Sequence, residues 1–161
     1  MKTIKTIILL FVCAVSCAQN YDKRFTVSIN TEPNAIIKDG FNFGVNIDYQ
    51  MTYTYFKAGI YSFPDLNKVG YFQYHGAIGL NKHLGLFEDS RVYLGLVLGA
   101  NFRQGNSNPI AGVEVGYQYY ISEKIGIGVN ASELYRGDSK YYGSDRVVYN
   151  GSIELIFKIG K

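Results

Sequence analysis

The 161-residue sequence has no tryptophan, three prolines and two cysteines, and only 18% of its residues are charged. An average soluble domain is about 25% charged. A disordered chain would carry more charge and fewer aromatic residues than the 16% found here. No apolar run reaches the roughly 18 residues that indicate a membrane-spanning helix. The composition therefore argues against a disordered chain and a helical membrane protein, and the length allows one domain.

Both cysteines lie near the start of the chain, in a segment with the pattern of a secretory signal peptide. Lys2 and Lys5 form a short basic start, residues 6–15 are largely apolar, and Ser16-Cys17-Ala18 matches the small-x-small pattern that signal peptidase cuts. We expect residues 1–18 to be a signal peptide cleaved after Ala18. A membrane anchor over the same stretch is one alternative. Lipoprotein processing at Cys17 is another, because Ala14-Val15-Ser16-Cys17 loosely resembles a lipobox, although Leu is usual where Ala14 stands.

Cleavage after Ala18 would leave a mature chain, residues 19–161, that contains no cysteine. Such a chain has no disulfide, no thiolate nucleophile and no cysteine-ligated metal. Without Lys2 and Lys5 the 16 basic residues fall to 14 against 13 acidic ones, a net charge of about +1. No basic patch is left, so nucleic acid is not expected as a partner.

Apolar and polar residues alternate with a period of two through most of the mature chain, which is typical of β-strands with one apolar face. Val92, Leu94 and Leu96, for example, share one face of a strand. The alternation predicts eight strands, over residues 25–30, 41–50, 56–61, 72–80, 92–102, 111–119, 125–132 and 147–159. Several are long enough to cross a bilayer, which takes about 9–11 residues for a tilted strand.

The connections between the predicted strands are of two kinds, short turns and longer polar loops. Short turns are expected at Thr52-Tyr53 and over residues 120–124. Longer loops are expected over residues 31–39, 64–68, 103–109 and 136–146, at the opposite end of the sheet. The connection over residues 81–90 is long where a short turn would fit the alternation. Short turns at one end and long loops at the other are typical of outer-membrane barrels.

The composition of the two strand faces indicates which one is inside. The polar face is rich in glycine and carries five charged residues, which we take as a lumen charge network: Asp48, Lys57, Glu114, Glu154 and Lys158. Glycine weakens a water-exposed strand, but inside an eight-stranded barrel small residues relieve crowding. The apolar face is nearly free of charge, as a lipid-facing surface requires, because a central Lys or Arg there costs about 2–4 kcal/mol. We therefore expect lipid outside and a polar lumen inside.

Aromatic residues are expected to form two girdles at the membrane interfaces. Near the short turns these are Tyr49, Tyr117 and Tyr119, and toward the long loops they are Phe41, Phe63, Phe72, Phe102 and Tyr149. The alternative is that the aromatic residues form the core of an ordinary β-sandwich.

The signal peptide, the eight alternating strands, the alternating loop lengths and the amphipathic last strand together resemble the small outer-membrane β-barrel (porin-like) proteins of Gram-negative bacteria, of the OmpA-barrel or OmpX type. The resemblance implies an all-β fold, an eight-stranded antiparallel up-and-down transmembrane β-barrel over residues 19–161, with both termini in the periplasm. It also implies outer-membrane lipid and lipopolysaccharide as surroundings, insertion by the barrel-assembly machinery, and a monomer. One departure is the ending Phe157-Lys158-Ile159-Gly160-Lys161, where the family usually has a terminal aromatic residue.

Asp48 and Lys57 are expected to lie opposite each other across the first tight hairpin, with Glu114, Glu154 and Lys158 completing a polar network. A charge inside a narrow lumen must find partners, because an unpaired one costs several kcal/mol. The network is interpreted as a structural plug, with a gated ion path as the alternative.

No residue pattern indicates catalysis. His75 and His83 are the only histidines, and Glu88 and Ser90 nearby do not make a triad, which is a matter of geometry. The segment 126–131 matches a dinucleotide fingerprint on paper but lies within a strand, without the helix that the motif needs. We expect no enzyme activity, no cofactor and no metal site.

The loop over residues 136–146 is the longest polar loop, and Arg136, Tyr141 and Tyr142 are candidates for contact with an external partner. The function expected is that of a non-enzymatic outer-membrane barrel that serves envelope integrity or surface contact. Two alternatives stay open: a lipid- or lipopolysaccharide-modifying barrel enzyme, and a soluble lipocalin-like ligand-binding barrel.

Overall fold

Eight antiparallel strands make up most of the chain in the computed structural model, which describes residues 24–33, 36–37, 41–63, 70–84, 89–137 and 146–159. The predicted signal peptide lies outside the described residues, as do Tyr141 and Tyr142. The strands are β1 (Arg24–Thr31), β2 (Phe43–Gln50), β3 (Thr54–Phe63), β4 (Tyr71–Leu84), β5 (Ser90–Arg103), β6 (Asn106–Tyr120), β7 (Ile125–Arg136) and β8 (Val147–Ile159).

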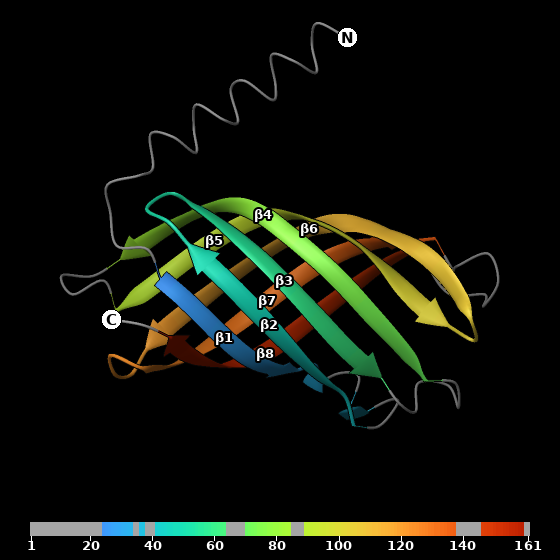
Figure 1. Ribbon diagram of the computed structural model, residues 1–161, viewed down its shortest axis with the longest axis horizontal. Coiled ribbons are helices and arrows are strands. Elements are labelled where there is room, and N and C mark those ends of the chain that lie inside the picture. The colour runs from blue at the N-terminus through green and yellow to red at the C-terminus, as the bar shows by residue number, and fades with distance from the viewer. Residues whose placement is uncertain are drawn as a thin grey trace, which may run out of the picture.

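The strands pair in sequence order, and β8 pairs with β1, so that the sheet closes into a barrel (Figure 1). The closing pair runs from Phe25 opposite Ile159 to Thr31 opposite Ile153. Closure gives every strand two hydrogen-bonded neighbours and leaves no sheet edge, which is the condition for a sheet to lie in lipid. The predicted eight-stranded antiparallel up-and-down barrel is confirmed.

Side chains alternate between a largely polar interior, which also holds a small buried apolar cluster, and a largely apolar exterior. On β5, Leu96 and Leu98 point outward and are 62% and 66% exposed, while Asn101 points inward and is 0% exposed. A water-soluble barrel would show the reverse arrangement, because apolar side chains leave water for the interior. The face assignment made from the glycine and charge pattern is therefore correct. One aromatic residue was misassigned, since Phe63 is buried with 4% exposure and does not join an outer girdle.

The barrel has two ends, which we name by their connections. The turn end is the end with the connections that follow β2, β4 and β6, together with the start of β1 and the end of β8; the loop end is the end with the connections that follow β1, β3, β5 and β7. At the turn end the backbone N–H of Met51 donates to the carbonyl of Thr54 at 2.9 Å, which closes the hairpin between β2 and β3.

Two predicted connections are shorter than expected. The predicted loop over residues 81–90 is largely strand, because β4 continues to Leu84 and pairs Leu84 with Ser90 of β5. The predicted loop over residues 103–109 is a two-residue turn, with Arg103 paired to Asn106. Gln104 and Gly105 have φ of 49° and 80°, as a type I′ hairpin turn requires. Polar residues suggested loops at both places, but strand ends beyond the lipid do not need an apolar face.

Candidate functional site

The lumen of the barrel is filled by polar side chains that form two charged layers with two tyrosine rings between them. We call the layer nearer the turn end the arginine layer, which consists of Arg91, Asp48, Gln118, Asn81 and Glu154. The layer nearer the loop end is the lysine layer, which consists of Lys57, Glu114 and Asn130. Tyr55 and Tyr93 lie between them.

The arginine layer is organised by Arg91, whose side chain is 0% exposed. Its guanidinium forms an ion pair with Asp48, donates to Gln118 Oε1 at 2.9 Å, and donates through Nε to Asn81 Oδ1 at 3.1 Å. The amide of Gln118 then donates to Glu154 Oε2 at 3.1 Å. The planar guanidinium of arginine can donate to several acceptors at once, so that this one side chain links residues of four strands, β2, β4, β5 and β6.

The lysine layer is built around a buried ion pair. Lys57 Nζ lies 3.1 Å from Glu114, and the Tyr55 hydroxyl donates to the same carboxylate at 2.7 Å. Asn130 donates to Glu114 Oε2 and to the Tyr93 hydroxyl, both at 3.0 Å. The carboxylate therefore accepts from three donors, which offsets the cost of removing it from water.

Tyr55 and Tyr93 connect the two layers. Their rings meet edge to face with centroids 5.3 Å apart. Lys57 Nζ lies 4.3 Å from the centroid of Tyr93, and Arg91 Cζ lies 4.7 Å from the same centroid. Both distances are within the range of a cation–π interaction, so that each cation has an aromatic partner in addition to its carboxylate.

Glycine on the inner face makes room for these rings. A Cβ atom placed at Gly95 would collide with the hydroxyl of Tyr55, and one placed at Gly116 would collide with the ring of Tyr93. These two inward glycines therefore provide space that the two tyrosine side chains occupy.

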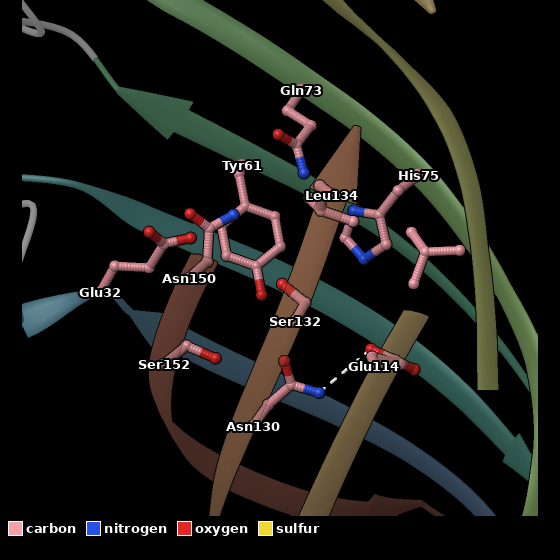
Figure 2. Close-up of a pocket in the computed structure, with 11 residues that line it drawn as sticks. Glu32, Tyr61, Gln73, His75, Glu114, Asn130, Ser132, Leu134, Asn150 and Ser152 are labelled. Carbon is pink, nitrogen blue, oxygen red and sulfur yellow. Dashed lines mark hydrogen bonds between the residues drawn. The ribbon is translucent and has the colours of Figure 1, made fainter. Parts of the chain in front are cut away.

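Between the lysine layer and the loop end lies a small polar pocket (Figure 2). It is lined by Glu32, Tyr61, Gln73, His75, Val97, Glu114, Asn130, Ser132, Leu134, Asn150 and Ser152, and its volume is about 20 Å³. That volume holds about one water molecule and is far below the roughly 300–1,000 Å³ of a typical small-molecule site.

Glu32 follows directly after β1 at the rim of this pocket, where Asn42 holds its backbone. The Glu32 N–H donates to Asn42 Oδ1 at 2.8 Å, and Asn42 Nδ2 donates to the Glu32 carbonyl at 3.0 Å. Burial raises the pKa of the Glu32 carboxyl to about 7, and the positive charge of Arg136 partly counteracts this rise.

The residues predicted as a lumen charge network all point inward. Asp48, Lys57, Glu114 and Glu154 are 1–5% exposed, while Lys158 is half-buried near the turn end, opposite Thr26. Asp48 and Lys57 are opposite each other on β2 and β3, as expected. They do not form the ion pair that this position suggested, because side chains from the far wall also reach the barrel axis and provide better partners.

The partners that the sequence did not single out are Arg91, Gln118, Asn130, Tyr55 and Tyr93. Arg91 and Tyr55 directly precede predicted strands, at positions whose parity is inward, so that extending the alternation by one residue would have found them. Tyr93 was already on the inward face of a predicted strand, and Asn130 and Gln118 were on inward faces as well, but nothing in the pattern showed which of them bind the ions.

Other candidate residues lie apart from the two layers. Arg136, expected in an exposed loop, is the last residue of β7 and is buried with 7% exposure, because the strand extends further than predicted. His75 lines the pocket, with its ring 5.2 Å from that of Tyr61, and His83 Nδ1 lies 3.3 Å from Arg24 Nη1 near the turn end.

Within the part of the chain that the structure describes, no cluster of three or more His, Cys, Asp and Glu side chains is positioned to hold a metal ion. The same residues contain no helix of the length and apolarity needed to cross a membrane.

Comparison with known proteins places the fold. No protein-family model matches the chain, and no curated protein matches it significantly. Among solved structures, the N-terminal β-barrel domain of Pseudomonas aeruginosa OprF is 14% identical and superposes with a TM-score of 0.52, covering 86% of this chain and 100% of that domain. The designed transmembrane barrel TMB2.3 is 16% identical, with a TM-score of 0.54 over 89% of this chain and 99% of that one. Neisserial surface protein A is 11% identical, with a TM-score of 0.49 over 84% and 94%.

The fold is therefore that of the small transmembrane β-barrels. The closed eight-stranded sheet agrees with the resemblance to OmpA-type and OmpX-type barrels that the sequence pattern suggested.

Proposed function

We propose that the protein is a non-enzymatic integral barrel of the outer membrane whose lumen is closed to ions, and which serves envelope integrity or surface contact through its external loops. The main support for a lumen that is closed to ions is the presence of two buried charged layers. Lys57, Glu114, Arg91 and Asp48 each have an oppositely charged partner at ion-pair distance.

Energetics support a plug over a conducting path. Breaking a buried ion pair by removing one partner costs about 3–5 kcal/mol, and an ion that passed through would have to displace such pairs in both layers. The tyrosine rings between the layers add a second obstruction, and the missing side chains of Gly95 on β5 and Gly116 on β6 leave the space that these rings occupy.

We further propose that the turn end faces the periplasm with both termini, and that the loop end faces outward. Long loops outside and short turns inside are the usual arrangement of such barrels. In this orientation Tyr141 and Tyr142 belong to the external loop that follows β7, and Arg136 lies at its base.

Planar-bilayer recording tests the closed lumen. The purified protein, inserted in a bilayer, is expected to give no stepwise conductance, and Lys57→Met is expected to leave the baseline unchanged. The double variant Tyr55→Ala with Tyr93→Ala removes both rings and is the positive control, in which openings are expected. Regular steps in the unmodified protein, altered in size or ion selectivity by Lys57→Met, would contradict the plug.

Cell fractionation tests the location. Expressed in a Gram-negative host, the protein is expected in the outer-membrane fraction and to require detergent for extraction. Recovery in the soluble periplasm without detergent would overturn the membrane proposal in favour of a soluble ligand-binding barrel. An altered lipopolysaccharide mass in cells that express the protein would instead favour an enzyme.

A further inference from the structure

The outward face of the strands carries two charges among the described residues, Lys82 on β4 and Glu133 on β7. Lys82 lies two residues before the end of β4, near the turn end, and its side chain is exposed. It has no hydrogen bond or ion pair with any residue in the described ranges. Lys82 is paired with Val92 on β5, which is paired in turn with Tyr117 on β6. A tyrosine of the turn-end girdle therefore lies close to Lys82.

Lys82 stands at one end of a shallow apolar groove on the outer surface of β4, β5 and β6, strands that lie side by side in Figure 1. The outward side chains that line this groove are Leu80, Lys82, Val92, Leu94 and Val115, and its volume is about 300 Å³. We call it the Lys82 groove. The groove extends from the cation toward the middle of β5, which is the direction from the membrane interface toward the membrane centre.

We propose that the Lys82 groove binds one glycerophospholipid from the leaflet at the turn end, with its phosphate on the Lys82 ammonium and an acyl chain along Leu80, Val92, Leu94 and Val115. This inference rests on the proposed membrane location. The proposal rests on charge complementarity. Lys82, a cation with no partner in the part of the chain that the structure describes, followed by an apolar groove, matches a headgroup phosphate followed by an acyl chain. A lysine stem lies along apolar surface while its ammonium reaches the polar region.

A second copy of the chain fits the groove less well. Two barrels in one membrane are parallel, so that residues at the same depth face each other across a symmetric interface. Lys82 would then face Lys82, while Glu133, three residues before the end of β7, lies toward the loop end and not at the depth of Lys82. The lipid phosphate is the anion that reaches Lys82 at its own depth.

The absence of tryptophan from the sequence permits a direct test with a single engineered fluorophore. Tyr117→Trp places a reporter beside the Lys82 groove. Tyr49→Trp on β2 places a second reporter in the same aromatic girdle, four strands from Tyr117 and two strands from Lys82. Each variant is folded into phosphatidylcholine vesicles with a fixed fraction of phosphatidylglycerol brominated on its acyl chains. Quenching then measures how strongly that anionic lipid is enriched at each reporter over the bulk bilayer.

We expect phosphatidylglycerol to be enriched at the Tyr117→Trp reporter by about fivefold, the contribution of one lysine near an anionic headgroup, and not at Tyr49→Trp. Adding Lys82→Gln should remove the enrichment, and adding Lys124→Gln, which neutralises a lysine of the β6–β7 turn at the same end, should leave it intact. Adding Val115→Phe, which fills the groove while Lys82 stays, should also remove it. Circular dichroism confirms that each variant is folded.

Equal enrichment at both reporters would overturn the proposal, as would enrichment that survives Lys82→Gln. Enrichment that survives Val115→Phe would overturn the groove and leave Lys82 as an interfacial anchor. Enrichment of brominated lipopolysaccharide in place of phosphatidylglycerol would assign the site to the other leaflet and overturn the occupant proposed here. If brominated phosphatidylcholine alone quenched neither reporter, the membrane location itself would have failed, which is distinguishable from failure of the lipid site. The planar-bilayer recordings test whether the lumen conducts ions, and neither outcome affects the proposed lipid site.

Discussion

Lys57, Glu114, Arg91 and Asp48 are buried charges, and each has a partner that makes burial tolerable. A buried ion pair is weak support for stability by itself, because desolvation offsets the attraction, but losing one partner is expensive. In this lumen the hydroxyls of Tyr55 and Tyr93 form hydrogen bonds with Glu114 and Lys57, and the Tyr93 ring contacts both cations. These contacts add to the stabilisation that each charge receives from its opposite charge. At the scale of single residues, the two layers are therefore a coupled unit.

The Lys57–Glu114 pair provides a double-mutant test of this coupling. We expect Glu114→Gln and Lys57→Met each to destabilise the barrel by about 3–5 kcal/mol, because each leaves the other charge buried without its partner. The double variant should cost less than the two single costs together, by about 0.5–3 kcal/mol. The measurement is urea-induced unfolding from phospholipid vesicles, followed by circular dichroism because the chain lacks tryptophan. Glu123→Gln, in the exposed β6–β7 turn, is the control, and strictly additive effects would argue against coupling.

Glu32 gives a pH dependence whose sign follows from its raised pKa. The folded barrel binds this proton more tightly than the unfolded chain does, so that the stabilisation is complete below pH 4.5 and is lost as pH rises through about 7. The loss is at most about 3 kcal/mol, from 1.36 kcal/mol per pKa unit. Glu32→Gln should remove this component. We expect the unfolding free energy of the unmodified protein to fall relative to that of Glu32→Gln as pH rises from 4 to 8. A difference between the two proteins that stays constant over this range would exclude a raised pKa.

Individual strands are specified by alternation, and their inner faces are shaped by glycine. The glycines are not equivalent. At Gly79 a Cβ atom would collide with the backbone of Leu94 and Gly95 on the next strand, whereas at Gly151, which faces outward on β8, it would meet nothing within 4 Å. Space at Gly79 is therefore a requirement of strand packing, and the lack of a side chain at Gly151 is not.

We therefore expect opposite results from the same substitution at the two positions. Gly79→Ala should destabilise the barrel by about 1–3 kcal/mol, because the neighbouring backbone cannot move aside without strain. Gly151→Ala should be neutral or stabilising by up to about 1 kcal/mol, because alanine restricts the unfolded chain more than glycine does. Unfolding in vesicles measures both. A similar loss at both positions would show that strand propensity, and not inner-wall contact, governs these glycines.

The β5–β6 turn is a second test at the scale of the element. Gln104 occupies a position with φ of 49°, where a residue other than glycine, asparagine or aspartate is uncommon. Gln104→Asn creates the Asn-Gly pair preferred in a type I′ turn and should stabilise the hairpin by several tenths of a kcal/mol. The midpoint of urea unfolding should rise without a change in slope. A lower midpoint would contradict the turn type.

At the scale of the whole molecule, polar residues fill the interior and apolar residues cover the exterior, the reverse of a water-soluble barrel. This arrangement is stable only where lipid replaces water around the sheet, because the outward leucines, valines and isoleucines would otherwise remain exposed. The closed sheet pairs the backbone of every strand, and two ion pairs, Lys57–Glu114 and Arg91–Asp48, compensate four of the buried lumen charges.

The lipid-facing surface predicts a depth-dependent cost for charge. Leu96→Lys, near the middle of β5, should destabilise the barrel by about 2–4 kcal/mol, whereas Leu84→Lys, at the end of β4, should cost about 0–1 kcal/mol. The measurement is the free energy of unfolding from vesicles. In a water-soluble barrel an exposed leucine changes to lysine with an effect within about 0.5 kcal/mol, so that a small, equal effect at both positions would argue against membrane insertion.

Elements were predicted more accurately than their ends or their partners. The alternation located all eight strands and both faces, since a period of two is a local property of the chain. The ends of β4, β5 and β7 were placed too early, because polar residues such as His83 and Arg136 have the same composition as a loop even though the backbone is still paired there. Local composition cannot distinguish a strand that has left the lipid from one that has ended.

The apolar-outside barrel could be predicted from the sequence, because alternation, inward glycine and the scarcity of charge are each visible along a single strand. The ion pairs could not be predicted in this way, because they form between strands that are distant in the sequence. Asp48 binds Arg91 and Lys57 binds Glu114 because closure of the sheet brings opposite walls within the length of one side chain, a distance that no spacing along the chain records. The same closure placed Lys82 at the end of an apolar groove that three strands build together.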